Sequence, residues 1–148
     1  MEEKTTAPKC FLVNHGAFYG REITNGMIFV PDRNAEAHKL IATVYPGDLF
    51  FHLSPSGISA LGRALSMPLC VPFPSWRYRE CRPGERGIAV QTEVFLLPMP
   101  VPVKQAELPY LTALSGAQAK SLFAKISEHL PGIAAAGWIK TVCFDPGF

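Results

Sequence analysis

The sequence predicts an α+β fold in which a small β-barrel is flanked by helices. Proline and glycine, at 14 and 12 of the 148 residues, make up about 18% of the chain, which divides it into short elements and disfavours a helical bundle. Residues 45–65 have the pattern of a β-hairpin, and residues 115–130 show a helical spacing of apolar residues. With 48% hydrophobic residues the chain can bury a core, so we expect one domain over residues 10–148, after a polar, disordered tail over residues 1–9.

The first part of the chain contains candidates for two strands and a short helix. Residues 10–14 (Cys-Phe-Leu-Val-Asn) form a compact apolar run before a turn, which predicts the first strand. We expect residues 17–25 to be irregular and residues 26–31 to form the second strand. Residues 34–41 have the spacing of a short helix, with Asn34 as its N-cap.

The hairpin is the most informative segment for the fold. A Pro-Gly turn precedes residues 49–53, an apolar run of strand length, and a Ser-Gly connection leads into residues 58–65, where small and apolar residues alternate. We expect the Asp48 side chain to hold the first turn by a hydrogen bond to the backbone. Small closed β-domains are built from such hairpins, so this segment favours a barrel.

The second part of the chain contains a long polar loop, one long strand and one long helix. Residues 67–74 are rich in proline and apolar residues, and residues 75–87 form a charged loop with two aromatic residues. Residues 88–97 are the clearest strand, whereas alternate prolines in residues 98–103 favour an extended path at a sheet edge and exclude a central strand. A serine at its start and a Pro-Gly pair after its end delimit the helix over residues 115–130.

Charge and cysteine usage exclude several classes of protein. The net charge of +2, from 14 basic and 12 acidic residues, is too small for nucleic-acid binding by bulk electrostatics, so such binding would depend on local charge. The four cysteines form no Cys-x-x-Cys pair and have no histidine at a usual ligand offset, so we expect no metal and no cofactor. The N-terminus lacks the apolar run of a signal peptide and no long apolar stretch occurs, so we expect a reduced, cytoplasmic protein without a membrane partner.

The loop over residues 75–87 concentrates the positive charge. Its four arginines and two glutamates give it a net charge of +2, which equals that of the whole chain. The arginines are Arg77, Arg79, Arg82 and Arg86. Positive charge beside aromatic side chains is typical of proteins that follow a phosphate backbone, and an ordinary solvated loop is the alternative.

Several segments, taken in chain order, resemble the EVE-like domains of the PUA, YTH and EVE superfamily, in particular a bacterial subgroup. The segments that carry the resemblance are residues 11–16 (Phe-Leu-Val-Asn-His-Gly), 26–31 (Gly-Met-Ile-Phe-Val-Pro) and 47–52 (Gly-Asp-Leu-Phe-Phe-His), then Trp76, the strand from Ile88 and the proline-bearing exit after it. The resemblance covers about residues 10–130. It implies a PUA-like barrel of the EVE or YTH type, flanked by helices.

This bacterial subgroup is associated with modification-dependent restriction enzymes, in which the domain recognises a methylated or hydroxymethylated base and a separate nuclease or motor module acts on the DNA. No nuclease motif and no phosphate-binding Gly-x-x-x-x-Gly-Lys occurs in this chain. The resemblance therefore implies a non-catalytic reader, most simply of 5-methyl- or 5-hydroxymethylcytosine in DNA, that flips the base into an aromatic pocket. N6-methyladenine in DNA or RNA stays open as the ligand.

A reader of this kind needs aromatic walls, because each base–aromatic stack contributes about 1–3 kcal/mol. The candidate pocket residues are Phe29, Trp76, Tyr78, Asn14, His52 and Tyr19, and the candidates for nucleic-acid backbone contacts are Arg77, Arg79, Arg82 and Arg86. Phe29 takes a position that is usually tryptophan in the subgroup, and Asn14, followed by His15, lies at a strand end where an amide could pair with a base edge. The structural alternatives are a core role for Phe29 and His52 and a turn role for Asn14.

Two other classes of function stay open from the sequence. A small hydrolase or transferase could use His52 with Cys70 or Cys81, although no spacing suggests this arrangement. A protein-interaction module could use the proline-rich edge over residues 98–103.

Overall fold

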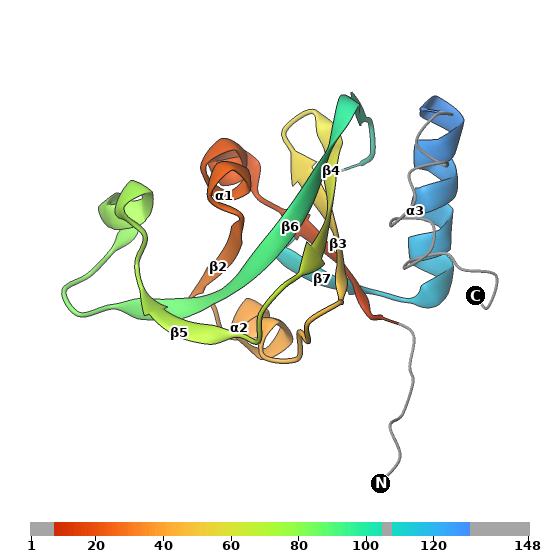
Figure 1. Ribbon diagram of the computed structural model, residues 1–148. Helices are drawn as coiled ribbons and strands as arrows, with labels where there is room; N and C mark the ends of the chain where they lie inside the picture. The colour runs from red at the N-terminus through yellow and green to blue at the C-terminus, as the bar shows by residue number, and fades with distance from the viewer. Residues whose placement is uncertain (1–7, 105–107, 131–148) are drawn as a thin grey trace, which may run out of the picture.

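The computed structural model describes residues 8–104 and 108–130, and within them a single curled sheet is surrounded by three α-helices and two short 3-10 helices (Figure 1). The strands are β1 (Cys10–Asn14), β2 (Met27–Pro31), β3 (Leu49–Ser54), β4 (Gly57–Ala64), β5 (Leu69–Pro72), β6 (Arg86–Val101) and β7 (Leu111–Leu114). The helices are η1 (Gly16–Phe18), α1 (Tyr19–Asn25), α2 (Ala35–Ile41), η2 (Ser75–Glu80) and α3 (Gly116–His129). The fold is therefore of the mixed α+β kind.

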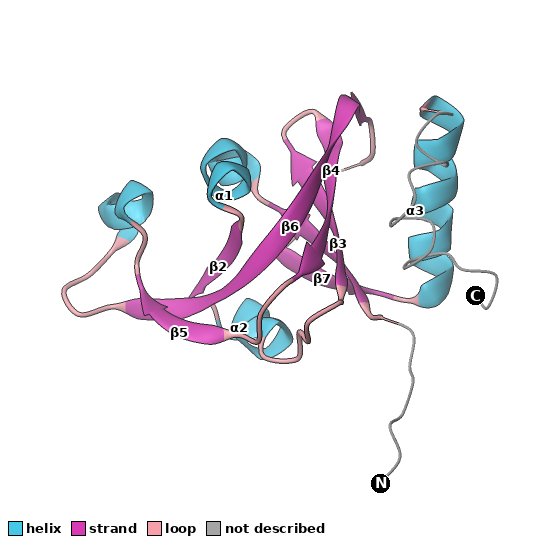
Figure 2. Ribbon diagram, viewed as in Figure 1, coloured by secondary structure: helices cyan, strands magenta, loops and turns pink. Residues whose placement is uncertain are grey.

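The strands follow the order β2-β6-β4-β3-β1-β7, and β5 also pairs with β6. Every pairing is antiparallel except that of β1 with β3, which is parallel. Figure 2 shows the sheet curling into a half-barrel. This architecture agrees with the predicted small barrel flanked by helices.

The 16-residue strand β6 joins the two parts of the curled sheet. Its first half, residues 86–91, pairs with β2 and β5, and its second half, residues 92–101, pairs with β4. The proline-rich segment that was predicted to be extended thus begins in the last part of β6. Among the described residues, this part of β6 pairs with β4 alone, so it lies at a sheet edge. Two of the prolines lie where the pairing register shifts opposite Ile58 and Ala60, a place that tolerates missing N–H donors.

The predicted strands before the hairpin, the hairpin itself and both predicted helices are confirmed. The Asn34 side chain accepts a hydrogen bond from the Ala37 N–H, and Ser115 and Gln118 form a capping box at the start of α3. Asp48 accepts from the Tyr45 N–H at 2.9 Å, as expected for the turn. Among the described residues, no helix has the length and apolar character needed to cross a membrane.

The sequence analysis was wrong about three segments. Residues 17–25 form η1 and α1 rather than an irregular stretch, the proline-rich segment over residues 67–74 contains β5, and β7 was not anticipated. The short elements β5 and β7 contain four residues each and owe their structure to pairing with β6 and β1. Of the predicted tail, residues 1–7 lie outside the described residues, and Lys9 is held by an ion pair with Asp48 at 2.9 Å.

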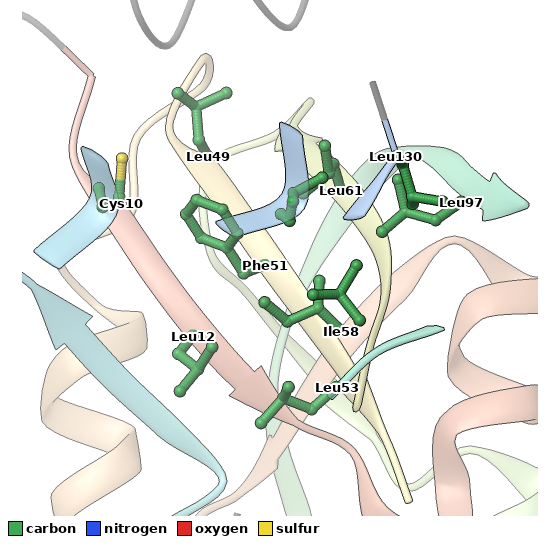
Figure 3. Close-up of a cluster of buried hydrophobic side chains, with 12 residues drawn as sticks. Cys10, Leu12, Leu49, Phe51, Leu53, Ile58, Leu61, Leu97 and Leu130 are labelled. Carbon is green, nitrogen blue, oxygen red and sulfur yellow. The ribbon is translucent and has the colours of Figure 1, made fainter. Parts of the chain in front are cut away.

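Side chains that alternate along β1 and β3 divide the interior into two clusters. Leu12, Phe51 and their neighbours on one face pack against α3, as Figure 3 shows for part of this cluster. Phe11 and Phe50 on the other face pack with residues of α2. His52 follows Phe50 on this second face and is 1% exposed, so a polar ring lies inside an otherwise apolar layer.

Candidate functional site

A chain of buried polar side chains begins at His52 of β3. His52 Nδ1 lies 2.7 Å from Nε2 of His15, which follows β1, and Nδ1 of His15 lies 2.5 Å from Oε1 of Glu22 on α1. The three residues are between 0% and 3% exposed. Since β1 and β3 are parallel neighbours and the short η1 and α1 follow β1, the fold brings the three side chains to one end of the curled sheet.

Glu22 is the centre of this arrangement. The Tyr110 hydroxyl donates to Glu22 Oε1 at 2.6 Å, and Arg77 Nη1 donates to Oε2 at 3.2 Å. Tyr110 also accepts from the N–H of Phe29, and Arg77 Nη1 lies 3.4 Å from the carbonyl of Phe29. We call His15, Glu22, His52, Arg77 and Tyr110 the Glu22 network; its buried carboxylate has a cation and neutral donors around it, as a buried charge requires.

The partners of Glu22 determine where the hydrogens lie when both histidine rings are neutral. The carboxylate can only accept, so Nδ1 of His15 donates to it and Nε2 of His15 accepts from Nδ1 of His52. Nε2 of His52 then carries a lone pair, has no hydrogen-bond partner among the described residues and lies against Gly62. A Cβ at position 62 would overlap this nitrogen, so the close approach requires glycine.

Two pKa values reflect this burial. Burial lowers the pKa of His52 well below its usual value of 6.5, and the neighbouring His15 lowers it further. Burial also raises the pKa of Tyr110 well above 10.0, and the adjacent Glu22 carboxylate adds to the effect. His52 therefore stays neutral and Tyr110 stays a hydroxyl donor around neutral pH.

Aromatic rings surround the network. The Arg77 guanidinium lies 4.3 Å from the centroid of the Phe18 ring and 5.3 Å from that of Phe29, which are cation–π distances. Tyr19 packs edge-on against His15 with a centroid distance of 5.7 Å. Tyr19 and Phe18 are half-buried, so this end of the sheet presents aromatic side chains at the surface.

Two of the predicted pocket residues belong to the core, which corrects the sequence analysis. The Phe29 ring is fully buried, lies 5.1 Å from the ring of Phe73 and covers Gly87 so closely that a Cβ there would overlap it. His52 is buried in the Glu22 network and has no surface for a base. Both positions face inward because their strands alternate, so in this structure neither is a pocket wall.

The other pocket candidates lie at or near the surface. Asn14 is half-buried and donates to the Leu108 carbonyl at 3.1 Å, so it fastens the segment before β7. Trp76 is half-buried in η2, and its Nε1 is shielded from solvent without a hydrogen-bond partner among the described residues. Tyr19 is half-buried beside His15. The backbone of Tyr78 belongs to η2, and its side chain lies outside what the structure describes.

The four predicted backbone-contact arginines divide into two kinds. Arg77 is 7% exposed and pairs with Glu22, so its expected contact with a phosphate is wrong in this structure. Arg79, Arg82 and Arg86 are exposed. Arg82 and Arg86 line an open groove of about 480 Å³ between β5 and the turn before β6, whose other lining residues include Phe73 and Glu85.

The sequence analysis did not identify Glu22 or Tyr110. Glu22 lies in a segment that was expected to be irregular, where a glutamate carries no sign of burial. Tyr110 lies just before β7, a strand that the sequence did not indicate. The contact between residues 22 and 110 depends on tertiary structure alone. The one sequence signal for a polar site in this region was Asn14-His15, two polar residues at the end of an apolar strand.

The histidine and the two cysteines of the hydrolase or transferase alternative lie in different surroundings. His52 contacts His15 and Gly62, whereas Cys70 contacts Arg86 on the exposed β5–β6 pair. Cys81 is next to Arg82, to whose carbonyl its thiol donates. Within the described part of the chain, no three His, Cys, Asp or Glu side chains are grouped in a way that could hold a metal ion.

Comparison with known proteins adds information about the fold. No protein-family model and no curated protein matches this chain. A crystal structure of a protein from Pseudomonas syringae is similar, with a TM-score of 0.53 and 13% identity over 78% of this chain and 97% of that one. A crystal structure of a protein from Pseudomonas putida has a TM-score of 0.55 and 13% identity over 78% and 98% of the two chains. At this identity the similarity concerns the fold alone.

Proposed function

We propose that this protein is a non-catalytic reader of a modified nucleobase, most simply 5-methyl- or 5-hydroxymethylcytosine in DNA, built on a PUA-like barrel of the EVE type. The observation that carries the proposal is the position of η2. Its buried Arg77 is paired with Glu22, while Trp76 and Arg79 on either side of it remain at or near the surface. A half-buried aromatic ring and an exposed cation thus belong to one short segment that a buried ion pair holds.

Trp76 has the properties of a base contact. Its ring is half-buried in η2, so the exposed part can stack against a base, while its indole N–H is shielded from solvent. A flipped base costs a few kcal/mol to extrude, and stacking returns about 1–3 kcal/mol for each aromatic side chain. We propose Trp76 and Tyr19 as stacking residues, with Tyr78 as a further candidate and Asn14 as a residue that holds the adjoining segment.

The exposed arginines would neutralise phosphates beside the base. Arg82 and Arg86 line the groove between β5 and the turn before β6, and Arg79 lies in η2 next to it in sequence. These three arginines outnumber the one negative charge that lines the groove, Glu85, which forms an ion pair with Arg33 at 3.4 Å. A nuclease or motor that acts on the bound DNA would be another domain or chain, and the proposed location is the cytoplasm.

Binding to matched oligonucleotides tests the proposal. Fluorescence anisotropy is measured with duplexes that carry cytosine, 5-methylcytosine, 5-hydroxymethylcytosine or N6-methyladenine at one position. We expect tighter binding to a modified cytosine, and Trp76→Ala to weaken it by about tenfold or more, the equivalent of one stacking interaction. Tyr45→Ala is the matched control, because Tyr45 is an aromatic residue that is 61% exposed on the loop before β3.

The salt dependence separates base recognition from phosphate neutralisation. Arg79→Gln and Arg82→Gln should make the slope of log affinity against log salt shallower by about 0.9 for each phosphate that is no longer neutralised, while Lys120→Gln on α3 should leave it unchanged. Preference for N6-methyladenine would replace cytosine by adenine as the ligand. Equal binding of all four duplexes, with no effect of Trp76→Ala, would exclude a reader function.

A further inference from the structure

Three side chains from separate segments, His15, Arg77 and Tyr110, contact the buried Glu22 carboxylate, and one of them belongs to η2. We infer that Glu22 is a positioning residue: it holds Arg77 and thereby sets the place of η2, and of Trp76 within it, relative to the sheet. The effect on base recognition rests on the proposed function, whereas the effect on the position of Trp76 does not.

The Arg77 side chain ties η2 to the sheet. Among the η2 side chains that the structure describes, Arg77 alone is buried, while Ser75 and Arg79 are exposed and Trp76 is half-buried. Its Nη1 donates to Glu22 on α1 and lies 3.4 Å from the carbonyl of Phe29 on β2. The segment η2 belongs to no strand pair, so this side chain is a principal link between η2 and the sheet.

The direction of the Arg77 side chain is restricted on several sides. The rings of Phe18 and Phe29 lie near its guanidinium, and Glu22 lies at its end. A planar guanidinium donates in fixed directions, whereas a lysine ammonium would supply the charge without the same geometry. The position of Arg77 therefore transmits the position of Glu22 to the preceding residue, Trp76.

Glu22 itself is held from other segments. His15 after β1 and Tyr110 before β7 donate to its Oε1 atom, and His52 of β3 orients His15 through the shared ring hydrogen. A carboxylate fixed by donors on two sides cannot rotate to follow a displaced arginine without breaking them. The Glu22 network thus holds the anchoring point of η2 through hydrogen bonds from several segments.

Fluorine NMR of 5-fluorotryptophan-labelled protein tests the position of Trp76 directly. In a Trp138→Phe background the single resonance reports Trp76. We expect Glu22→Gln and Arg77→Met to shift or broaden this resonance, with Arg77→Lys intermediate because it restores the charge alone. Arg63→Met is the control, since Arg63 also forms an ion pair with a glutamate, Glu93, but this pair joins β4 and β6 rather than η2 and α1.

Tyr110→Phe keeps the test decisive if the buried-charge variants do not fold, because it removes a single oxygen atom. We expect a smaller shift of the Trp76 resonance in this variant, since Glu22 keeps His15 and Arg77. An unchanged resonance in Tyr110→Phe and in Arg77→Lys would overturn the inference, and so would an unchanged resonance in folded Glu22→Gln.

Binding measurements separate this inference from the proposed function. We expect Glu22→Gln to reduce the preference for a modified over an unmodified duplex by about tenfold, without changing the part of the salt slope that Arg82 and Arg86, which lie outside η2, set. A wild-type protein without any preference, combined with a Trp76 resonance that responds to Arg77→Met, would refute the reader function and support the positioning role. A preference that survives Arg77→Met with an unshifted resonance would refute the positioning role alone.

Discussion

The two buried clusters on opposite faces of the same strands differ in chemistry. The cluster under α3 is formed by apolar side chains such as Phe51, Leu53 and Ile126, whereas the opposite face ends in the Glu22 network. His15, Glu22, His52 and Arg77 are as buried as the apolar cluster, and Tyr110 is half-buried. Apolar packing stabilises the fold in proportion to the buried apolar area and does not depend on the direction of individual contacts. Buried charged and polar groups are stable only when each hydrogen-bond partner is correctly placed. The comparison therefore associates the α3 face with the stability of the fold and the Glu22 network with the position of η2 and Trp76.

The largest expected effect comes from removing the carboxylate. Glu22→Leu leaves Arg77 buried without its anion and two donors without their acceptor, so we expect a loss of about 3–5 kcal/mol in the free energy of unfolding. Urea denaturation measures it. A loss below about 1 kcal/mol, the range of exposed ion pairs, would show that the network adds little to the fold.

A truncation on the apolar face should cause a similar loss of stability but leave the position of Trp76 unchanged. Leu53 is fully buried beneath α3, and Leu53→Ala should cost about 2–5 kcal/mol from reduced burial and a cavity. The Trp76 fluorine resonance should stay at its wild-type position below the unfolding transition. If Leu53→Ala shifts that resonance as much as Glu22→Gln does, the two faces do not differ in function.

The smallest expected effect is a dependence on pH that belongs to the network. Because the pKa of His52 is lowered in the folded protein, the unfolded chain binds a proton first, so stability is complete above pH 6.5 and falls as the pH drops below it toward the lower folded pKa. One proton gives a slope of at most about 1.4 kcal/mol per pH unit. The slope is measured from urea denaturation midpoints at several pH values between about 7.5 and 5, a range that spans the usual histidine pKa of 6.5.

A matched pair of variants isolates this slope from the titration of other groups. His52→Gln should flatten the dependence relative to wild type, whereas His129→Gln on the exposed end of α3 should not. Identical slopes in wild type and His52→Gln would assign the acid sensitivity to other titratable groups of the protein.

Local patterns were enough to predict much of the fold. The apolar run at residues 10–14, the hairpin around Gly57 and the capped helices at residues 35–41 and 116–129 form where their own residues favour them. The short strands β5 and β7 could not be predicted, because four residues have no periodicity to read and their structure depends on a neighbouring strand. The candidate site was predicted in part: Trp76 and three arginines do lie at or near the surface, but Phe29 and Arg77 are buried.

By itself, the sequence determined the alternation and the capping signals that make a curled sheet with helices, because these depend on neighbours within a few residues. Only the tertiary structure decided which polar residues are buried together. Glu22 and Tyr110 are 88 residues apart, yet the Tyr110 hydroxyl lies 2.6 Å from Oε1 of Glu22. Arg77, from a segment that the sequence analysis expected to be a charged surface loop, donates to the same carboxylate. A buried charge requires partners that are close in space, and these can come from any part of the chain. Spacing along the sequence therefore does not predict them.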